Sequence, residues 1–314
     1  MIIGIKPTVD YAFKHTFGRE STKPLLIDVL NQVLQSSTTN FLSEVELMNP
    51  LNQKEALDDK LSILDIKARD QSKRQFNIEM QILAFRHYEK RILYYGTRLH
   101  QHQLQEGEAY GQLKPTISVS FLDFVLFPQV SDHHLCFRLL EKSHQFPLTS
   151  DLEFHILELP KFKRTAAELE TGLDVWLYFL RNAETMDIDN LPPALQQPLV
   201  LRAFEELKML ALTELEREKY ESRRKAQMDY ISGMSAAREE GLEEGLEKGL
   251  EKGLRKGIEE GIERGQKKGK IADIQNYERL LGIPGSPVEQ LASIPIDALA
   301  RRAEELLALL IDRK

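Results

Sequence analysis

The sequence alternates apolar and polar residues over LDIKARD at residues 64–70 and again over RQFNIEMQI at residues 74–82. Alternation with a period of two is typical of β-strands whose two faces have different surroundings. The three residues between the runs, 71–73, are enough for a turn. The pattern therefore predicts an antiparallel hairpin with Asp65 and Lys67 on the same face of its first strand.

The same alternation predicts the register of this hairpin. The polar residues of the second strand share one face: Gln75, Asn77, Glu79 and Gln81. A loop of three residues pairs the two polar faces, whereas a loop of even length would set Asp65 beside the apolar Ile78. The predicted register places Asp65 opposite Glu79, with their Cβ atoms about 5 Å apart.

Two directly opposed carboxylates repel each other unless a proton or a cation lies between them. A hard divalent cation with oxygen ligands fits that position. The alternative is an ordinary amphipathic hairpin with a solvated polar face, because antiparallel sheets commonly expose one face to water. The hairpin alone leaves both interpretations open.

Around the hairpin, the first 164 residues predict a mixed α/β unit. Apolar residues at helical spacing predict helices over 10–17, 25–34 and 84–105. Strand-like runs lie at 41–48, 61–68, 76–83, 115–127, 135–141 and 152–159. We therefore expect the α/β class, with a sheet of about six strands flanked by helices.

After Pro160 the pattern becomes helical, with predicted helices over 166–182 and 193–234. The chain is expected to divide into four segments: a mixed α/β core at 1–164, a helical extension at 165–234, a repeat helix or linker at 235–270 and a small helical unit at 271–314.

Glycine recurs at every fourth position from Gly241 to Gly269, and leucine or isoleucine follows each of the first six of these eight glycines. We name residues 241–269 the glycine ladder. A four-residue step turns a helix by about 400°, so the glycine stripe winds around the helix with right-handed sense. Eight glycines cost about 8 kcal/mol of helix propensity relative to alanine. The ladder is therefore either a helix packed against a partner, which predicts a homo-oligomer, or a charged, frayed helix or spacer.

Composition excludes several classes of protein. One cysteine, Cys136, among 314 residues rules out an intramolecular disulfide framework and a multi-cysteine metal site. No apolar run approaches the roughly 20 residues that span a bilayer, so we expect no membrane association and a cytoplasmic location. Residues 1–164 hold 20 basic and 20 acidic residues, and residues 165–314 hold 22 and 29. A role on DNA would thus need local basic patches or a bound metal.

Several runs in the first half of the chain, taken in order, carry a family resemblance. They are DYAFKHTFG (10–18), LLIDVLN (25–31), LDIKA (64–68), FNIEMQ (76–81), RILYY (91–95), EGEAY (106–110), KPTISV (114–119) and LELPKF (157–162). Together they resemble the Rpn family of recombination-promoting nucleases, also described as PD-(D/E)XK nuclease family transposase-like proteins. The resemblance implies a restriction-endonuclease-like mixed sheet with flanking helices.

The resemblance also implies an activity, metal-dependent hydrolysis of DNA phosphodiesters, and a set of site residues. Asp65 and Glu79 would bind Mg²⁺, or Mn²⁺, together with the carbonyl of Met80. Gln81 completes the catalytic set in the E-x-Q variant of the motif, where the wider superfamily usually has lysine. Asp10 corresponds to the acidic residue that the superfamily often contributes from its first helix, or is a first-turn or N-cap residue.

A neutral amide at Gln81 cannot supply positive charge. Lys67, on the same face as Asp65, or Lys14 from the first helix could supply it instead. Arg91 could contact phosphate or belong to a partly buried structural stripe. The expected function is a DNA endonuclease linked to recombination, mobile elements or defence. The alternative is a weakly active or inactive nuclease-fold module that binds DNA and assembles through its C-terminal helices.

Overall fold

The computed structural model describes residues 1–35, 40–48, 51–52, 62–63 and 65–312. The chain forms two compact units, Met1–Ile231 and Ser232–Lys314, which we describe separately.

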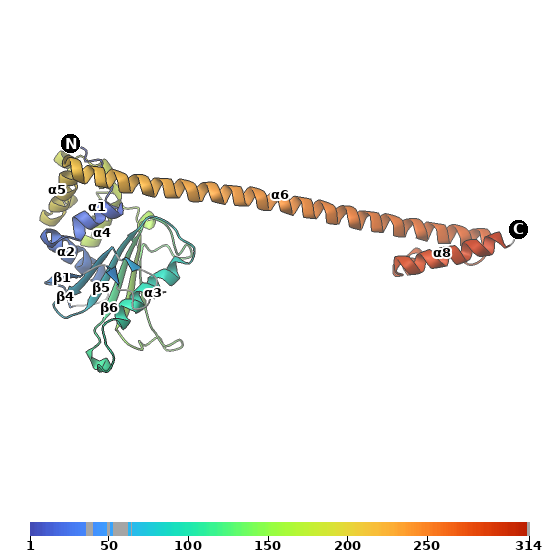
Figure 1. Ribbon diagram of the computed structural model, residues 1–314, viewed down its shortest axis with the longest axis horizontal. Coiled ribbons are helices and arrows are strands. Elements are labelled where there is room, and N and C mark those ends of the chain that lie inside the picture. Colours follow the sequence, from blue (N-terminus) through green and yellow to red (C-terminus); the bar gives the residue numbers. More distant parts are fainter. Residues whose placement is uncertain (36–39, 49–50, 53–61, 64, 313–314) are drawn as a thin grey trace. The chain divides into compact units, whose positions relative to one another are not determined.

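A mixed six-stranded sheet forms the centre of the first unit (Figure 1), and its strand order is β1-β4-β5-β6-β8-β7. The strands are β1 Val45–Met48, β4 Ile66–Asp70, β5 Gln75–Gln81, β6 Thr116–Leu122, β7 His134–Arg138 and β8 Leu152–Glu158. The central strands β5, β6 and β8 run parallel, and the other pairs are antiparallel. Two further short strands, β2 Leu51–Asn52 and β3 Ser62–Ile63, pair with each other. The predicted α/β class is confirmed.

The helices are α1 Asp10–Phe17, α2 Lys23–Leu34, α3 Tyr88–Gln101, α4 Gly172–Asn182, α5 Pro198–Leu212, α6 Glu214–Leu281, α7 Val288–Ala292 and α8 Ile296–Ile311. Short 3₁₀ turns lie at Glu20–Thr22, Tyr110–Gln112, Leu159–Lys161, Ala183–Thr185, Ile188–Asn190 and Pro193–Leu195.

Three helix predictions differ from the structure at their ends. The helix predicted from residue 84 begins at Tyr88, because His87 takes a left-handed backbone conformation with φ 63°. The helix predicted from residue 166 begins after Thr171, whose hydroxyl accepts a hydrogen bond from the Asp174 amide and caps it. The helix predicted over 193–234 is interrupted at Thr213, whose extended backbone separates α5 from α6.

The six predicted strands correspond in order to the six strands of the main sheet, with shifted or shorter bounds. The strand predicted over 61–68 is divided, because Ser62–Ile63 form β3 of the small pair and β4 begins at Ile66. The strand predicted over 41–48 begins at Val45. Of the strand predicted over 61–68, Leu61 and Leu64 lie outside the described residues.

Helices cover both faces of the sheet (Figure 1). On one face, Phe76, Ile78 and Met80 of β5 pack into the main apolar core with residues of α1, α2, α4 and α5. On the other face, Tyr88 and Ile92 of α3 pack against apolar residues of β6 and β8. Because α3 covers it, the face of β5 opposite the main core is not exposed to solvent.

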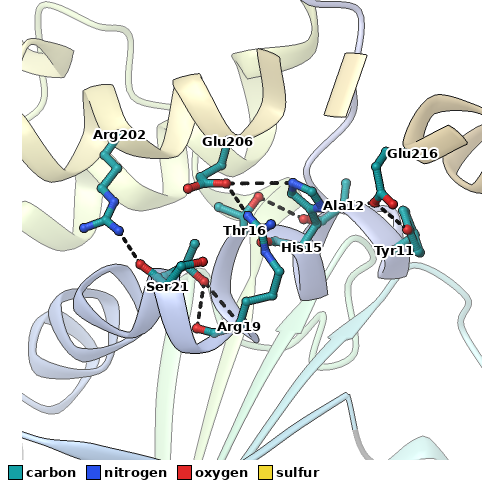
Figure 2. A network of polar contacts seen from close by, with 10 residues as sticks. Tyr11, Ala12, His15, Thr16, Arg19, Ser21, Arg202, Glu206 and Glu216 are labelled. Atoms are coloured by element: carbon teal, nitrogen blue, oxygen red, sulfur yellow. Dashed lines mark hydrogen bonds and ion pairs between the residues drawn. The ribbon is translucent and has the colours of Figure 1, made fainter. Parts of the chain in front are cut away.

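A polar network fixes α1 against α5 and the beginning of α6 (Figure 2). Arg19, just after α1, pairs with Glu206 of α5. The hydroxyl of Tyr11 donates to Glu216 of α6 at 2.7 Å, and Nδ1 of His15 lies 3.5 Å from the same carboxylate. Burial lowers the pKa of His15. The network positions the first turns of α1, which carry two of the predicted site residues.

The second unit contains the glycine ladder and a small apolar core. Residues of α6, α7 and α8 form that core around Ile274, Leu291 and Leu299. The ladder is helical throughout, as part of α6. Among the described residues, none lies within 4 Å of a Cβ added at any of its eight glycines. The leucine and isoleucine side chains that follow the glycines are 54–74% exposed.

A search of the described helices for a bilayer-spanning segment finds none that is both long and apolar enough.

Candidate active site

The hairpin has the register that its alternation predicts. Ile66 of β4 pairs with Ile78 of β5, and Lys67 pairs with Asn77. The turn closes at Lys73, which has a positive φ of 65°. The same register, continued by one residue, brings Asp65 opposite Glu79.

The β5 part of the polar face is buried, whereas the polar residues of β4 are partly exposed; this disagrees with the interpretation of an ordinary solvated face. Asn77 is 1% exposed and Glu79 is 5% exposed. Periodicity correctly separated the two faces of β5, but it could not show that α3 covers the polar one. Burying a carboxylate is costly unless its charge is compensated, so the surroundings of Glu79 need an explanation.

Glu79 receives two hydrogen bonds from neutral groups. The Asn77 amide donates to Oε1 at 3.2 Å, and the Tyr88 hydroxyl of α3 donates to Oε2 at 3.1 Å. Burial raises the pKa of Glu79, and the negative charge of Asp65 raises it further. The charge of Arg91 lowers the pKa of Glu79 and offsets part of this effect. An additional cation between the two carboxylates would offset the rest.

Asp65 is held by the backbone of β5 and by α1. Its Oδ2 accepts a hydrogen bond from the Met80 amide at 2.9 Å, and Lys14 Nζ lies 3.0 Å from Oδ1. The amide contact ties Asp65 to the residue after Glu79. The ion pair places the predicted charge of Lys14 at the site, beside a carboxylate that is 19% exposed.

A cavity of about 320 Å³ opens at this point, and four separate parts of the chain line it. The lining residues are Asp10, Asp65, Glu79, Met80, Gln81, Ile82, Arg91, Arg223, Ala226 and Gln227. The structure therefore brings together the predicted set Asp10, Asp65, Glu79, Met80 and Gln81. Asp10 is the first residue of α1, and its Oδ1 accepts a hydrogen bond from the next backbone amide.

Arg91 of α3 lies against aromatic rings and also lines the cavity. Its guanidinium carbon is 5.7 Å from the ring centroid of Phe85, 5.8 Å from that of Tyr88 and 5.3 Å from that of Tyr95. The Nε of Arg91 is buried and has no hydrogen-bond partner among the described residues. Arg91 thus joins the two roles considered for it, because it packs as a structural residue and brings a donor to the cavity.

Gln81 and Lys67 occupy different positions relative to the cavity. Gln81 lines it, and its Nε2 donates to the carbonyl of Leu83 at 3.2 Å. In the described part of the chain, Lys67 does not line the cavity. Burial lowers the pKa of Lys67, and the neighbouring charge of Arg69 lowers it further.

Sequence reasoning missed the contribution of α6. Arg223 and Gln227 come from the first turns of this helix, more than 140 residues after the hairpin. Their spacing of four places them on one helix face, but spacing does not show which face meets the sheet. Arg223 adds a second cation to a cavity lined by three carboxylates. Its positive charge was therefore the one property in the sequence that could have suggested this position.

The oxygen-rich lining fits a hard divalent cation. Mg²⁺ and Mn²⁺ are bound by one or two carboxylates, with waters and substrate oxygens completing the shell. Among the described residues, the carboxylate oxygens of Asp10, Asp65 and Glu79 do not form a group within 4.8 Å of one another, whereas one ligand atom each of Cys136, Glu153 and His155 does. The pair Asp65 and Glu79, with the backbone of Met80, is therefore the smallest set that fits such an ion.

A family model described as PD-(D/E)XK nuclease family transposase matches residues 7–237. No curated protein and no solved structure matches the chain. The matched range includes every residue that lines the cavity, the first turns of α6 among them.

Proposed function

The chain belongs to the PD-(D/E)XK nuclease family transposases, and from this premise we propose that it is a divalent-metal-dependent endonuclease that hydrolyses DNA phosphodiester bonds. The observation that carries the proposal is the cavity itself. It combines the buried carboxylate of Glu79 with Asp65 and with two arginines, Arg91 and Arg223. The activity would serve DNA recombination, the movement of mobile elements or defence against foreign DNA.

In this proposal Asp65, Glu79 and the carbonyl of Met80 hold Mg²⁺, which Mn²⁺ can replace. The ion would supply an activated water and offset the charge that develops on the phosphate. The chain's own contribution is to hold the two carboxylates in place. Tyr88 and Asn77 orient Glu79, and the Met80 amide orients Asp65.

The cations around the cavity are proposed to bind the DNA backbone. Arg91 and Arg223 line the cavity, and their guanidinium groups can donate paired hydrogen bonds to phosphate oxygens. Lys14 stays on Asp65 and supplies the charge that the superfamily's usual lysine would supply. Gln81 is proposed to orient water or phosphate through its amide. Lys67 has at most a supporting role in this scheme.

The test is nicking of supercoiled plasmid DNA by the full chain with Mg²⁺ or Mn²⁺. We expect Asp65→Asn and Glu79→Gln each to abolish nicking, while both proteins remain folded by circular dichroism. Glu46→Gln is the matched control, because Glu46 is an exposed carboxylate on β1 of the same sheet. It should cut as the wild type does. Nicking that survives in Glu79→Gln would contradict the proposal, and a folded wild type that binds metal but never cuts DNA would favour the DNA-binding and assembly module.

We also propose that the glycine ladder joins two copies of the chain in antiparallel orientation. The ladder has exposed apolar residues at every fourth position and room for close approach at each glycine. Its charges divide into two halves. Residues 238–253 hold three basic and six acidic residues, whereas residues 254–270 hold six basic and three acidic residues. An antiparallel pair sets each acidic half against a basic half, whereas a parallel pair opposes like charges.

Charge reversal in the two halves tests this arrangement in the full chain. Reversing Glu243, Glu244 and Glu247 to lysine should weaken self-association, as measured by light scattering over a range of protein concentrations. Reversing Arg264, Lys267 and Lys268 to glutamate in the same chain should restore it. In a parallel pair each half faces its own copy, so the first set of reversals would replace one repulsion between like charges by another. The second set would then restore nothing. An equal mass for all variants would contradict pairing through the ladder.

A further inference from the structure

A second group of metal-binding side chains lies on the β7–β8 pair, outside the nuclease cavity. Cys136 of β7 is the cross-strand partner of His155 of β8, and Glu153 lies two residues before His155 on the same face. One ligand atom from each of these residues lies within 4.8 Å of the other two. None of the three lines the cavity that holds Asp65 and Glu79.

We propose that Cys136, Glu153 and His155 bind a transition-metal ion of the zinc class, at a site separate from the nuclease centre. The donor set is a thiolate, a carboxylate and an imidazole, which suits Zn²⁺ or Co²⁺ and does not suit Mg²⁺. Zinc lies about 2.0–2.3 Å from such donors. Donors of one tetrahedral ion therefore lie about 3.3–3.8 Å apart. Nε2 of His155 and Oε1 of Glu153, now 2.6 Å apart, would move apart by less than about an ångström, and Sγ of Cys136, within 4.8 Å of both, would move closer by about an ångström or more.

The outer atoms of two of these ligands are already held by neighbouring residues. Arg138 donates to Oε2 of Glu153 from Nε at 2.9 Å, which leaves Oε1 directed at His155. Nε2 of His134 lies 2.9 Å from Nδ1 of His155. Partners of this kind orient metal-binding carboxylates and imidazoles and fix the tautomer of the ring. The group therefore resembles a metal site both in its three donors and in the neighbouring residues that hold two of them in place.

The ion would take the position now bridged by a hydrogen bond. Nε2 of His155 and Oε1 of Glu153 are 2.6 Å apart, and Sγ of Cys136 completes the three donors. His155 then carries its ring proton on Nδ1 and donates it to His134, which moves its own proton to Nδ1. The thiol proton goes to solvent, so one proton is released for each ion bound. Burial and the charge of Glu153 raise the pKa of Cys136 to about 11, so the ion has to displace that proton.

The position of the group suggests what the ion would do. His155 is fully buried, whereas Cys136 is exposed, so an ion can enter from solvent and reach a buried ligand. β7 is the edge strand of the sheet and pairs only with β8 among the described strands. A bound ion would connect the two strands through side chains and would protect that edge.

The experiment uses the full chain with Asp65→Asn and Glu79→Gln, so that the nuclease centre does not compete for metal. Co²⁺ is added, and the thiolate-to-cobalt absorption in the near ultraviolet is recorded. Because the chain has one cysteine, that absorption reports on Cys136 alone. We expect it to saturate at one equivalent, to disappear on addition of Zn²⁺ and to persist in excess Mg²⁺.

Three variants of that protein complete the test. Cys136→Ser should lose the absorption, and Glu153→Gln should weaken Co²⁺ binding at least about tenfold. His144→Gln is the matched control, because His144 is an exposed histidine of the loop after β7 and should leave binding unchanged. Zn²⁺ should raise the melting temperature of the parent protein and not that of Cys136→Ser. A folded parent that develops no thiolate absorption would overturn the proposal, as would full-strength binding by Glu153→Gln. Neither result would bear on DNA cleavage.

Discussion

The polar face of the β4–β5 hairpin and the glycine ladder of α6 depart from ordinary burial in opposite directions. On the hairpin, Asn77 and Glu79 are polar and buried. On the ladder, Leu242, Leu246 and Leu250 are apolar and 73–74% exposed. Both arrangements cost free energy in an isolated chain, and each therefore points to something that the chain binds.

The difference between the two regions lies in what is already in place. Around Glu79 the chain supplies two hydrogen-bond donors, a covering helix and the nearby charge of Arg91, so the proposed site lacks only a small cation. Along the ladder the chain supplies nothing, since no atom approaches the positions of added Cβ atoms in the described structure. A preorganised polar site predicts a small ligand, whereas an uncovered apolar stripe predicts a macromolecular partner.

The largest expected effect separates the two regions by activity. Glu79→Gln should lower the rate of plasmid nicking by about 10³-fold or more, which corresponds to about 4 kcal/mol. Leu250→Gln, a substitution of similar size in the ladder, should change the nicking rate by no more than a few-fold when both proteins are compared at the same concentration. Comparable losses in both variants would mean that catalysis depends on assembly, and would contradict the separation of the hairpin site from the ladder by function.

The next effect concerns the ladder alone. Replacing Gly249, Gly253 and Gly257 by alanine adds about 3 kcal/mol of helix propensity. A solitary helix should then melt at a higher temperature by circular dichroism. If two ladders pack closely, the new methyl groups instead hold them apart, and we expect self-association to weaken by at least about tenfold. Sedimentation of the full chain distinguishes these results. Unchanged self-association would contradict close packing of two ladders at the glycines.

A smaller effect tests how the hairpin site is held. Tyr88→Phe removes the hydroxyl that donates to Glu79 Oε2, a hydrogen bond of about 1–1.5 kcal/mol. That bond favours the charged carboxylate, so its loss should raise the pKa of Glu79 further. Because metal binding requires the ionised form, the acidic limb of the pH–rate profile should move to higher pH. A lower rate with an unmoved limb would assign Tyr88 a packing role only.

The smallest effect is on stability without metal. Since the pKa of Glu79 is raised in the folded state, the folded chain binds more protons than the unfolded chain near that pKa. Stability should then fall as the pH rises through it. Glu79→Gln should be more stable than the wild type by about 1 kcal/mol at neutral pH, and the difference should shrink in acid. Thermal melts at several pH values measure it, and added Mg²⁺ should stabilise only the wild type.

The sequence was sufficient for the parts of the molecule that local pattern controls. Alternation over two short runs predicted the hairpin, its register and the proximity of Asp65 to Glu79, because a shift by one residue would place Phe76 and Ile78 on the polar face of β4. Family resemblance added Asp10, which the structure places in the lining of the same cavity.

The remaining parts depend on contacts that local pattern does not encode. The burial of Glu79 comes from α3, and the cation Arg223 comes from α6. The grouping of Cys136 with His155 comes from the pairing of β7 with β8. Each of these depends on how distant segments pack, and helix or strand periodicity specifies which faces exist but not what each face meets.

The most direct test of the account is to measure Mn²⁺ binding by electron paramagnetic resonance in the wild type, in Glu79→Gln and in the control Glu46→Gln. Cys136→Ser serves as a second control, since a thiolate site should contribute little to the binding of a hard ion. The account predicts that Mn²⁺ binds to the wild type and both controls and that Glu79→Gln loses this binding. Equal binding by Glu79→Gln and the wild type would contradict a metal centre on the hairpin.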